Sequence, residues 1–269
     1  MIDLHVHSDI SDGKDSVETI LRMAHDKGIK IISFVDHDTT ETIQIAKPIA
    51  ESLDIELIPG IEISAYDFKR RRKVHVLGYN YRTTQYIDEI TRPILSRRHN
   101  HSLWQLNQII DAGYRVDEAV INNRIKKYPL YKQHIMNALI ELPYDDVEYQ
   151  KLYQKLFKND GVASGDIEYV DVKEAIKAIK QDFGKVVIAH PGQLDSYDLI
   201  QELLIEDSSI IDGIETWHYD HSEEDVHKCN RIAQQFSLIE TGGSDYHGAF
   251  GASYPVGYHT TSMDNYKRL

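Results

Sequence analysis

The sequence has little of what marks secreted, disulfide-linked or membrane-spanning proteins. Its 269 residues include a single cysteine, Cys229, which excludes a disulfide framework within the chain and a zinc site built on cysteines. No apolar run approaches the length that spans a bilayer, and the N-terminal segment lacks a signal-peptide pattern. We therefore expect a protein of the reducing cytoplasm that has no membrane partner.

Positive charge is scarce as well. Lys and Arg number 30 against 43 Asp and Glu, which gives a formal net charge of −13. Proteins that bind duplex DNA use basic surfaces to displace counterions, so this balance argues against duplex DNA as a partner. It does not exclude a small phosphorylated substrate, because divalent cations bound in an acidic cleft reverse the local potential.

Short strand patterns that alternate with amphipathic helical patterns make up most of the chain. The strand-like runs cover residues 2–7, 30–36, 55–63, 74–79, 185–190, 210–216 and 236–241. The clearest helical patterns cover residues 16–27, 40–53, 172–183 and 223–235. Strands that alternate with helices indicate an α/β protein with a mainly parallel sheet or barrel.

The pattern changes between the fourth and fifth strand-like runs. Residues 86–158 have a helical period, with breaks near Gly113, Pro129 and Pro143. We predict a helical subdomain over residues 86–171, inserted into a β/α domain formed by residues 1–85 and 172–269. The basic stretch 69–73 is expected at the tip of a hairpin, where a solvated turn is favoured over contact with a polyanion.

Residues able to bind metals follow the strand-like runs. In the first run His5 and His7 share one face of the strand, and Asp12 follows in a turn rich in Asp, Ser and Gly. The other runs contain or precede Asp36, His37, Asp38, Glu62, His75, His190, Glu215, His218, Asp245 and His247. The carboxyl ends of barrel strands form one rim, so these side chains are expected to converge. Imidazoles mixed with carboxylates suit divalent transition metals.

Each motif also has an ordinary structural explanation. His75 alone is typical of a half-buried strand histidine, and His190 before a proline could simply cap a strand. The segment 36–38 could be a helix N-cap, with Asp38 or Thr39 in that role. The joint placement of the motifs at strand ends favours a site. Histidines on helical or terminal segments without carboxylate neighbours are expected outside it: His25, His99, His101, His227 and His259. His221 is left undecided.

The motifs together resemble one known family. The segments that carry the resemblance are His5-Val-His7, Asp36-His37-Asp38, Gly60-Ile-Glu62-Ile-Ser64, Val74-His75-Val-Leu-Gly-Tyr79, His190-Pro191 and Gly243-Ser-Asp245-Tyr-His247. They are similar to motifs of the polymerase-and-histidinol-phosphatase (PHP) family of metal-dependent phosphoesterases. The resemblance implies a distorted seven-stranded β/α, TIM-like barrel that holds two or three metal ions at the carboxyl ends of its strands.

The same resemblance implies a ligand set for each metal. The first metal would take His5, His7, Glu62 and Asp245. The second would share Glu62 and add His75 and His190, and the third would use Asp12, His37 and His247. Manganese, iron and zinc all fit these ligands.

The helical segment resembles that of one substrate class within the family but differs from it at one motif. It resembles that of the nucleotide and oligonucleotide phosphatases of the family, which usually carry Gly-Arg-Pro-His-Ile-Ala. Here the corresponding stretch is Tyr131-Lys132-Gln-His134-Ile-Met136. Lysine offers a phosphate a point charge where arginine offers a planar fork, so the substrate of those relatives does not transfer directly.

The expected reaction is attack of a metal-activated water on phosphorus, since no serine or cysteine elbow motif is present. His218, His134 and Asp38 are candidates to protonate the leaving group, and Lys132, His134 and His218 to bind the substrate. The predicted activity is hydrolysis of a phosphate ester of a nucleotide or short oligonucleotide. A histidinol-phosphate phosphatase is the alternative enzyme. A non-catalytic metal-binding or protein-interaction domain is the alternative of another class.

Overall fold

The computed structural model describes residues 1–140 and 146–269, so the break expected at Pro143 lies outside the described residues. The chain divides into two compact units, Met1–Arg92 with Tyr169–Leu269, and Pro93–Glu168. Among the described residues, no helix combines the length and apolar character that crossing a membrane requires.

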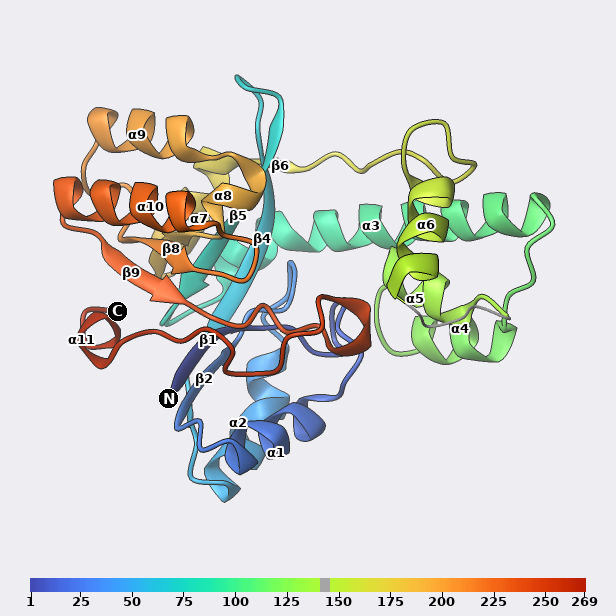
Figure 1. Cartoon of the computed structure of the whole chain (residues 1–269), viewed down its shortest axis with the longest axis horizontal. Helices are drawn as coiled ribbons and strands as arrows, with labels where there is room; N and C mark the ends of the chain where they lie inside the picture. The colour runs from blue at the N-terminus through green and yellow to red at the C-terminus, as the bar shows by residue number, and fades with distance from the viewer. Residues whose placement is uncertain (141–145) are drawn as a thin grey trace. The chain divides into compact units, whose positions relative to one another are not determined.

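The first unit contains two β-sheets (Figure 1). One is parallel and has the order β1 (Ile2–Val6), β2 (Ile31–Phe34), β3 (Glu56–Leu57). The other has the order β6 (Val170–Asp171), β4 (Gly60–Asp67), β5 (Arg72–Tyr79), β7 (Lys185–Ile188), β8 (Gly213–Trp217), β9 (Ile239–Gly242). All pairings in it are parallel except those of β5, which runs antiparallel to β4 and β7.

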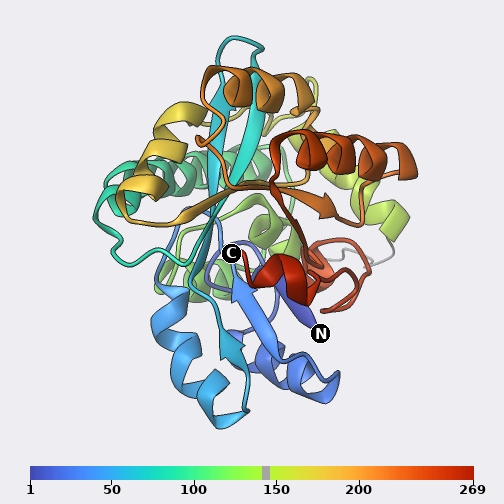
Figure 2. The same cartoon turned by 90° about the vertical axis from the view of Figure 1, so that its left-hand side faces the viewer.

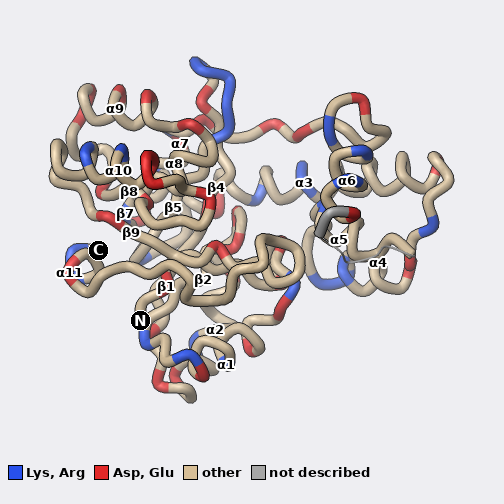
Figure 3. The backbone as a smooth tube through the Cα atoms, viewed as in Figure 1, with Lys and Arg blue, Asp and Glu red and all other residues tan. Residues whose placement is uncertain are grey.

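The strands match the seven predicted runs with two differences. The run 55–63 is divided between β3 and β4, and β6 was not predicted. Both β3 and β6 have two residues, which is too short to produce a periodic pattern. As predicted, the basic stretch 69–73 lies at the turn between β4 and β5, drawn as a blue segment in Figure 3. Lys69 and Arg70 both bind Glu202 there, so ion pairs account for part of its charge.

The helices of the first unit lie beside these sheets. The predicted ones are α1 (Val17–Asp26), α2 (Thr42–Ser52), α7 (Val172–Gln181) and α10 (Glu223–Phe236), and the others are α8 (Pro191–Leu194), α9 (Tyr197–Glu206), the 3₁₀ turn η1 (Gly248–Phe250) and α11 (Met263–Tyr266). In Figure 2 the blue helices α1 and α2 lie beside the three-stranded sheet, and α7, α9 and α10 surround the six-stranded sheet. Helix α1 ends before Gly28, whose φ of +72° favours glycine.

A shared core joins the two sheets. Its buried members are Ile2, Leu4, Ile31, Val35, Ile58, Leu77, Tyr79, Val187 and Ala189. The Tyr79 hydroxyl donates to the Leu4 carbonyl at 2.8 Å. Isolated bridges pair Val6 with Tyr246 and His37 with Glu62. The carboxyl ends of β1 and β2 therefore lie beside the β9 loop and β4.

The second unit is built from the remainder of α3 (Gln85–Asp111), with α4 (Glu118–Ile125), α5 (Lys132–Ala138) and α6 (Asp146–Phe157). It has a separate core that includes Ile109, Leu130, Ile135 and Met136. The compact unit covers Pro93–Glu168 and is shorter than the predicted subdomain of residues 86–171. The start of α3, before residue 93, belongs to the first unit.

Candidate metal centre

The nine side chains predicted as metal ligands come together in the first unit, within overlapping groups of His, Asp and Glu. His5 lies in β1, Glu62 in β4 and His75 in β5, and the others follow β1, β2, β7 and β9: His7, Asp12, His37, His190, Asp245 and His247. Most are buried, and His37, His75 and His247 are partly exposed. The nine side chains therefore converge as expected, although Glu62 lies near the start of β4 and His75 in the middle of β5 rather than at the ends of their strands.

Two imidazoles and two carboxylates form the first group. The Nε2 atoms of His5 and His7 are 3.2 Å apart. Each lies 3.2 Å from Asp245 Oδ1, and they lie 3.4 and 3.1 Å from Glu62 Oε2. Ligands bound about 2.1 Å from a tetrahedral ion are separated by about 3.4 Å. The atoms of His5, His7 and Asp245 are spaced in this way, and Glu62 Oε2 lies at a similar distance from both imidazoles.

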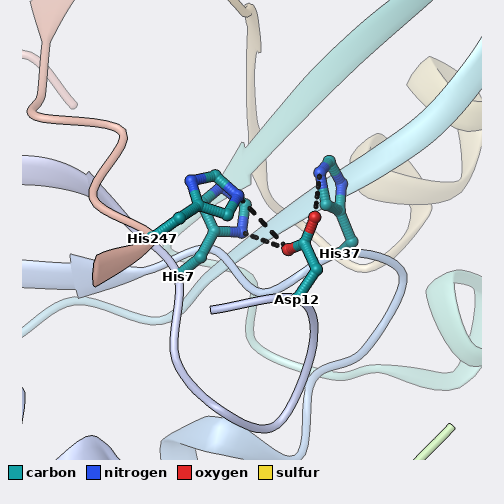
Figure 4. Close-up of side chains that lie close together, drawn as sticks. All are labelled: His7, Asp12, His37 and His247. Atoms are coloured by element: carbon teal, nitrogen blue, oxygen red, sulfur yellow. Dashed lines mark ion pairs between the residues drawn. The ribbon is translucent and has the colours of Figure 1, made fainter. Parts of the chain in front are cut away.

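The second group surrounds Asp12 (Figure 4). Asp12 Oδ1 lies 3.3 Å from His247 Nε2 and 3.8 Å from His7 Nδ1, and Asp12 Oδ2 lies 3.9 Å from His37 Nε2. The rings of His7 and His247 stack with centroids 4.1 Å apart. His7 thus presents one ring nitrogen to each group, whereas the family resemblance implied that it binds one metal.

Glu62 connects the remaining histidines. Its Oε1 lies 2.9 Å from His75 Nδ1 and 3.0 Å from His190 Nε2. Its Oε2 lies 3.5 Å from His37 Nδ1. His75 lies in the middle of β5, which runs antiparallel to β4, and its pairing with Ser64 places it near Glu62. The half-buried strand position that is typical of a structural histidine is therefore compatible with the cluster.

The cluster combines ionised carboxylates with histidines whose pKa values are shifted in opposite directions. Burial raises the pKa of the Glu62 carboxyl, but the surrounding histidines outweigh burial and hold its pKa well below the usual range. Burial lowers the pKa of His7, yet Asp245 and Glu62 together raise it to about 10. For His37 burial prevails and lowers the pKa to about 3. Without a metal, protons on some histidines supply the compensating positive charge.

The hydrogen-bond partners of His5 and His7 also indicate that the cluster suits divalent cations. His5 Nδ1 lies 2.9 Å from a carboxylate oxygen of Glu215, so the neutral ring carries its proton there. Its Nε2 lone pair then faces the oxygens of Glu62 and Asp245, which are also acceptors. In addition, Nδ1 of the buried His7 has no hydrogen-bond partner. A cation satisfies all of these atoms, and imidazole and carboxylate are ligands of manganese, iron and zinc.

The predicted catalytic candidates have different surroundings. The buried His218 has its Nε2 3.1 Å from Asp245 Oδ2, and its Nδ1 accepts from the Asp220 backbone N–H. The buried Asp38 accepts from the Ser64 backbone N–H at 2.8 Å. The side chain of His218 thus contacts the predicted ligand Asp245, whereas Asp38 is linked to the predicted ligand Glu62 through its backbone N–H, which donates to the Glu62 carbonyl at 2.9 Å.

Lys132 and His134, predicted to bind the substrate, lie on α5 of the second unit. His134 is buried, and its Nδ1 accepts from the Tyr131 backbone N–H at the start of the helix. The Lys132 ammonium lies over the ring of Phe157. Their role in binding the substrate stays a prediction.

The sequence placed Glu215 among the residues able to bind metals but assigned it to no ion, and the structure shows it fully buried beside His5. The available signal was an acidic residue within an apolar strand pattern. The undecided His221 has a structural role, because its ring nitrogens bind the Thr216 carbonyl and the Gly192 N–H. Over the described part of the chain, none of the five histidines expected outside the site belongs to a ligand group.

Known proteins resemble this chain along most of its length. The PHP domain model matches residues 3–189. The phosphoribosyl 1,2-cyclic phosphate 1,2-diphosphodiesterase of Eggerthella lenta is 44% identical, over 95% of this chain and 97% of that protein. A 5′-3′ exoribonuclease of Haemophilus influenzae is 27% identical, over 91% and 89%.

Solved structures share the α/β fold. A protein from Bifidobacterium adolescentis, at 23% identity, gives a TM-score of 0.86 over 98% of this chain and 93% of that one. An amidohydrolase from Chromobacterium violaceum, at 22% identity, gives 0.83 over 99% and 96%. Together with the convergent ligand groups, the family match and the relatives confirm the family and activity that the motifs predicted. The chain belongs to the PHP family and is a metal-dependent phosphoesterase, a hydrolase of phosphoric ester bonds.

Proposed function

We propose that the chain hydrolyses a phosphoribosyl cyclic phosphate. The observation that carries this proposal is the 44% identity, at nearly full mutual coverage, with a protein named for that activity. In the hydrolysis, water adds across one P–O ester bond, and the sugar oxygen that leaves phosphorus takes a proton. The product is a phosphate monoester with a free hydroxyl group.

We propose the predicted ligand sets with one extension. The first metal takes His5, His7, Glu62 and Asp245, the second takes Glu62, His75 and His190, and the third takes Asp12, His37 and His247. The 3.8 Å from His7 Nδ1 to Asp12 Oδ1 supports His7 as a further ligand of the third. Bound divalent ions neutralise phosphate charge and lower the pKa of a coordinated water.

His218 is our proposed proton donor. Its Nδ1 accepts from the Asp220 N–H, so its proton is on Nε2, against Asp245 Oδ2. The proton is therefore held beside the proposed metal ligands. Asp38 is the weaker candidate, because its carboxylate accepts from the β4 backbone. Lys132 and His134 remain our proposed phosphate-binding residues.

The finer features of the fold and setting are proposals as well. The bridges of Val6 with Tyr246 and of His37 with Glu62 link the two sheets, which supports a distorted β/α barrel. We propose that the helical unit of residues 93–168 contacts the substrate. The single buried cysteine, Cys229, suits a reducing cytoplasm.

A nucleotide or oligonucleotide end is the second candidate substrate. It is favoured by the exoribonuclease of Haemophilus influenzae and by a 3′,5′-nucleoside bisphosphate phosphatase of Chromobacterium violaceum, which is 24% identical. Both relatives are much more distant from this chain than the Eggerthella lenta protein.

A substrate panel tests the proposal. The protein is reconstituted with Mn²⁺ and assayed with phosphoribosyl 1,2-cyclic phosphate, a 3′,5′-bisphosphonucleoside, short 5′-phosphorylated RNA and histidinol phosphate. We expect kcat/KM for the cyclic phosphate to exceed the others on the order of 100-fold, because discrimination between such substrates depends on differential transition-state binding. Higher kcat/KM for the RNA or the bisphosphate would replace the first proposal with the second.

A further inference from the structure

Glu215 is a fully buried carboxylate whose two oxygens are both engaged by predicted metal ligands. It lies in β8 and is 0% exposed. Its Oε1 lies 2.9 Å from His5 Nδ1, and its Oε2 accepts from the backbone N–H of His190 at 2.9 Å. A buried carboxylate is costly unless its oxygens are paired. With both oxygens bound to N–H groups, Glu215 supports the ligands and leaves metal binding to others.

The contact with His5 determines which ring nitrogen carries the proton. Donation from Nδ1 to Glu215 leaves a lone pair on Nε2. Nε2 is the atom that lies 3.2 Å from Asp245 Oδ1 and within the first ligand group. Glu215 therefore holds His5 in the tautomer that binds a cation, as second carboxylates do for many metal-bound histidines.

The contact with His190 acts on the backbone. His190 has a φ of +22°, which is uncommon for a residue other than glycine, and it immediately precedes α8. A strained backbone persists only where its surroundings hold it. The hydrogen bond from the His190 N–H to Glu215 helps to hold the backbone in this conformation. In the same residue, Nε2 of the ring lies 3.0 Å from Glu62 Oε1. This second ligand belongs to a different proposed metal.

We propose that Glu215 is a positioning residue that couples two metal positions, by fixing the tautomer of His5 and the backbone of His190. The inference rests on the proposed ligand sets. Glu215→Gln removes the charge at nearly constant volume. The new amide has a single acceptor oxygen, so it cannot accept from both His5 Nδ1 and the His190 N–H. With its NH2 group toward His5, the imidazole proton moves to Nε2 and blocks its lone pair; with its NH2 group toward His190, the backbone N–H loses its acceptor. We expect weaker binding of both ions, by about 10- to 100-fold.

Glu240→Gln is the matched control. Glu240 lies on the neighbouring strand β9, is partly buried and accepts from the Thr216 hydroxyl at 3.0 Å. It loses the same charge near the same strand without touching His5 or His190. Glu215→Asp keeps the charge but is one methylene shorter, so it serves as the second variant if Glu215→Gln does not fold.

The experiment measures metal binding without substrate. Each protein is stripped with EDTA, checked by circular dichroism, and titrated with Mn²⁺ in competition with a chelator. For Glu215→Gln we expect the dissociation constants of two sites to rise by about 10- to 100-fold, with the control within twofold of the wild type. Phosphoesterase activity should return at high Mn²⁺ with an unchanged KM.

Three results separate the possible failures. A folded Glu215→Gln, or Glu215→Asp in its place, that binds Mn²⁺ as the wild type does overturns the role of Glu215. A change in one site alone overturns the coupling. Failure of the wild type to bind Mn²⁺, Fe²⁺ or Zn²⁺ overturns the proposed ligand sets themselves.

Discussion

At the scale of single residues, His7 shows how one side chain serves two groups. Its Nε2 lies 3.1 Å from Glu62 and 3.2 Å from Asp245, while its Nδ1 lies 3.8 Å from Asp12. The spacing of His5 and His7 along a strand predicts that both rings leave the same face. It does not predict which ring nitrogen lies near which carboxylate, because the path of the 8–13 loop determines where Asp12 lies.

Replacing His7 should therefore disrupt more than one metal position. In His7→Ala we expect phosphoesterase activity at saturating Mn²⁺ to fall on the order of 100-fold or more, since ligand loss impairs metal-assisted hydrolysis. The control is His25→Ala, which changes a half-exposed histidine on α1. Steady-state kinetics and metal content check both variants. Activity of His7→Ala within tenfold of the wild type, with its fold intact, would count against the proposed ligand sets.

At the scale of elements, one buried carboxylate holds the loop that carries Asp12. Asp36 accepts from the Ser8 N–H at 2.8 Å, the Ser8 hydroxyl at 2.7 Å and the Ser11 hydroxyl at 2.5 Å. It also accepts from the Thr42 hydroxyl at 2.6 Å.

The N-cap position of α2 is Glu41. The alternative that placed Asp38 or Thr39 there is therefore wrong.

Asp36→Asn should loosen this loop. An amide in place of the carboxylate leaves at least one of these donors without an acceptor, which costs about 1–3 kcal/mol for a buried group. Urea unfolding in EDTA should show a loss of that size, and the Mn²⁺-dependent activity should fall as Asp12 loses its support. Asp26→Asn, an exposed change at the end of α1, is the control. Equal stability of Asp36→Asn and the wild type would show that the loop is held by other contacts.

At the scale of the whole molecule, a chain of net charge −13 buries several carboxylates in one place. Because these carboxylates interact with histidines, the stability of the metal-free protein should fall both at alkaline pH and at acid pH. The pKa of His7 is raised to about 10, so its contribution to stability is complete below pH 6.5 and is lost as the pH rises through 10. Burial opposes ionisation of Glu215, but the nearby histidines lower its pKa to about 2, so its contribution is present above pH 4.5 and lost toward pH 2.

We therefore expect the stability of the EDTA-treated protein to be highest near pH 6.5. His37, whose pKa burial lowers to about 3, adds to the loss on the acid side, because its neutral form is the favoured one. Saturating Mn²⁺ should remove the alkaline loss, since metal binding displaces protons and strengthens as the pH rises. Urea unfolding from pH 3 to 10, with and without Mn²⁺, measures both curves. A metal-free stability that stays constant between pH 6.5 and 10 contradicts the charge state assigned to the cluster.

The amino-acid sequence was enough to predict the order of the main elements and to locate the candidate metal ligands along the chain. Strand periodicity and the positions of His, Asp and Glu near the strands are local properties, so the main strands, four helices and a set of candidate ligands were predictable. The resemblance to the PHP family then selected the nine clustered residues from that set. The tertiary structure alone decided the antiparallel direction of β5, the pairing of His5 with Glu215 and the backbone role of His221. His5 and Glu215 are 210 residues apart, and their contact depends on strand pairing and register. No local pattern encodes that pairing, because it is set by how the two sheets close around a common core.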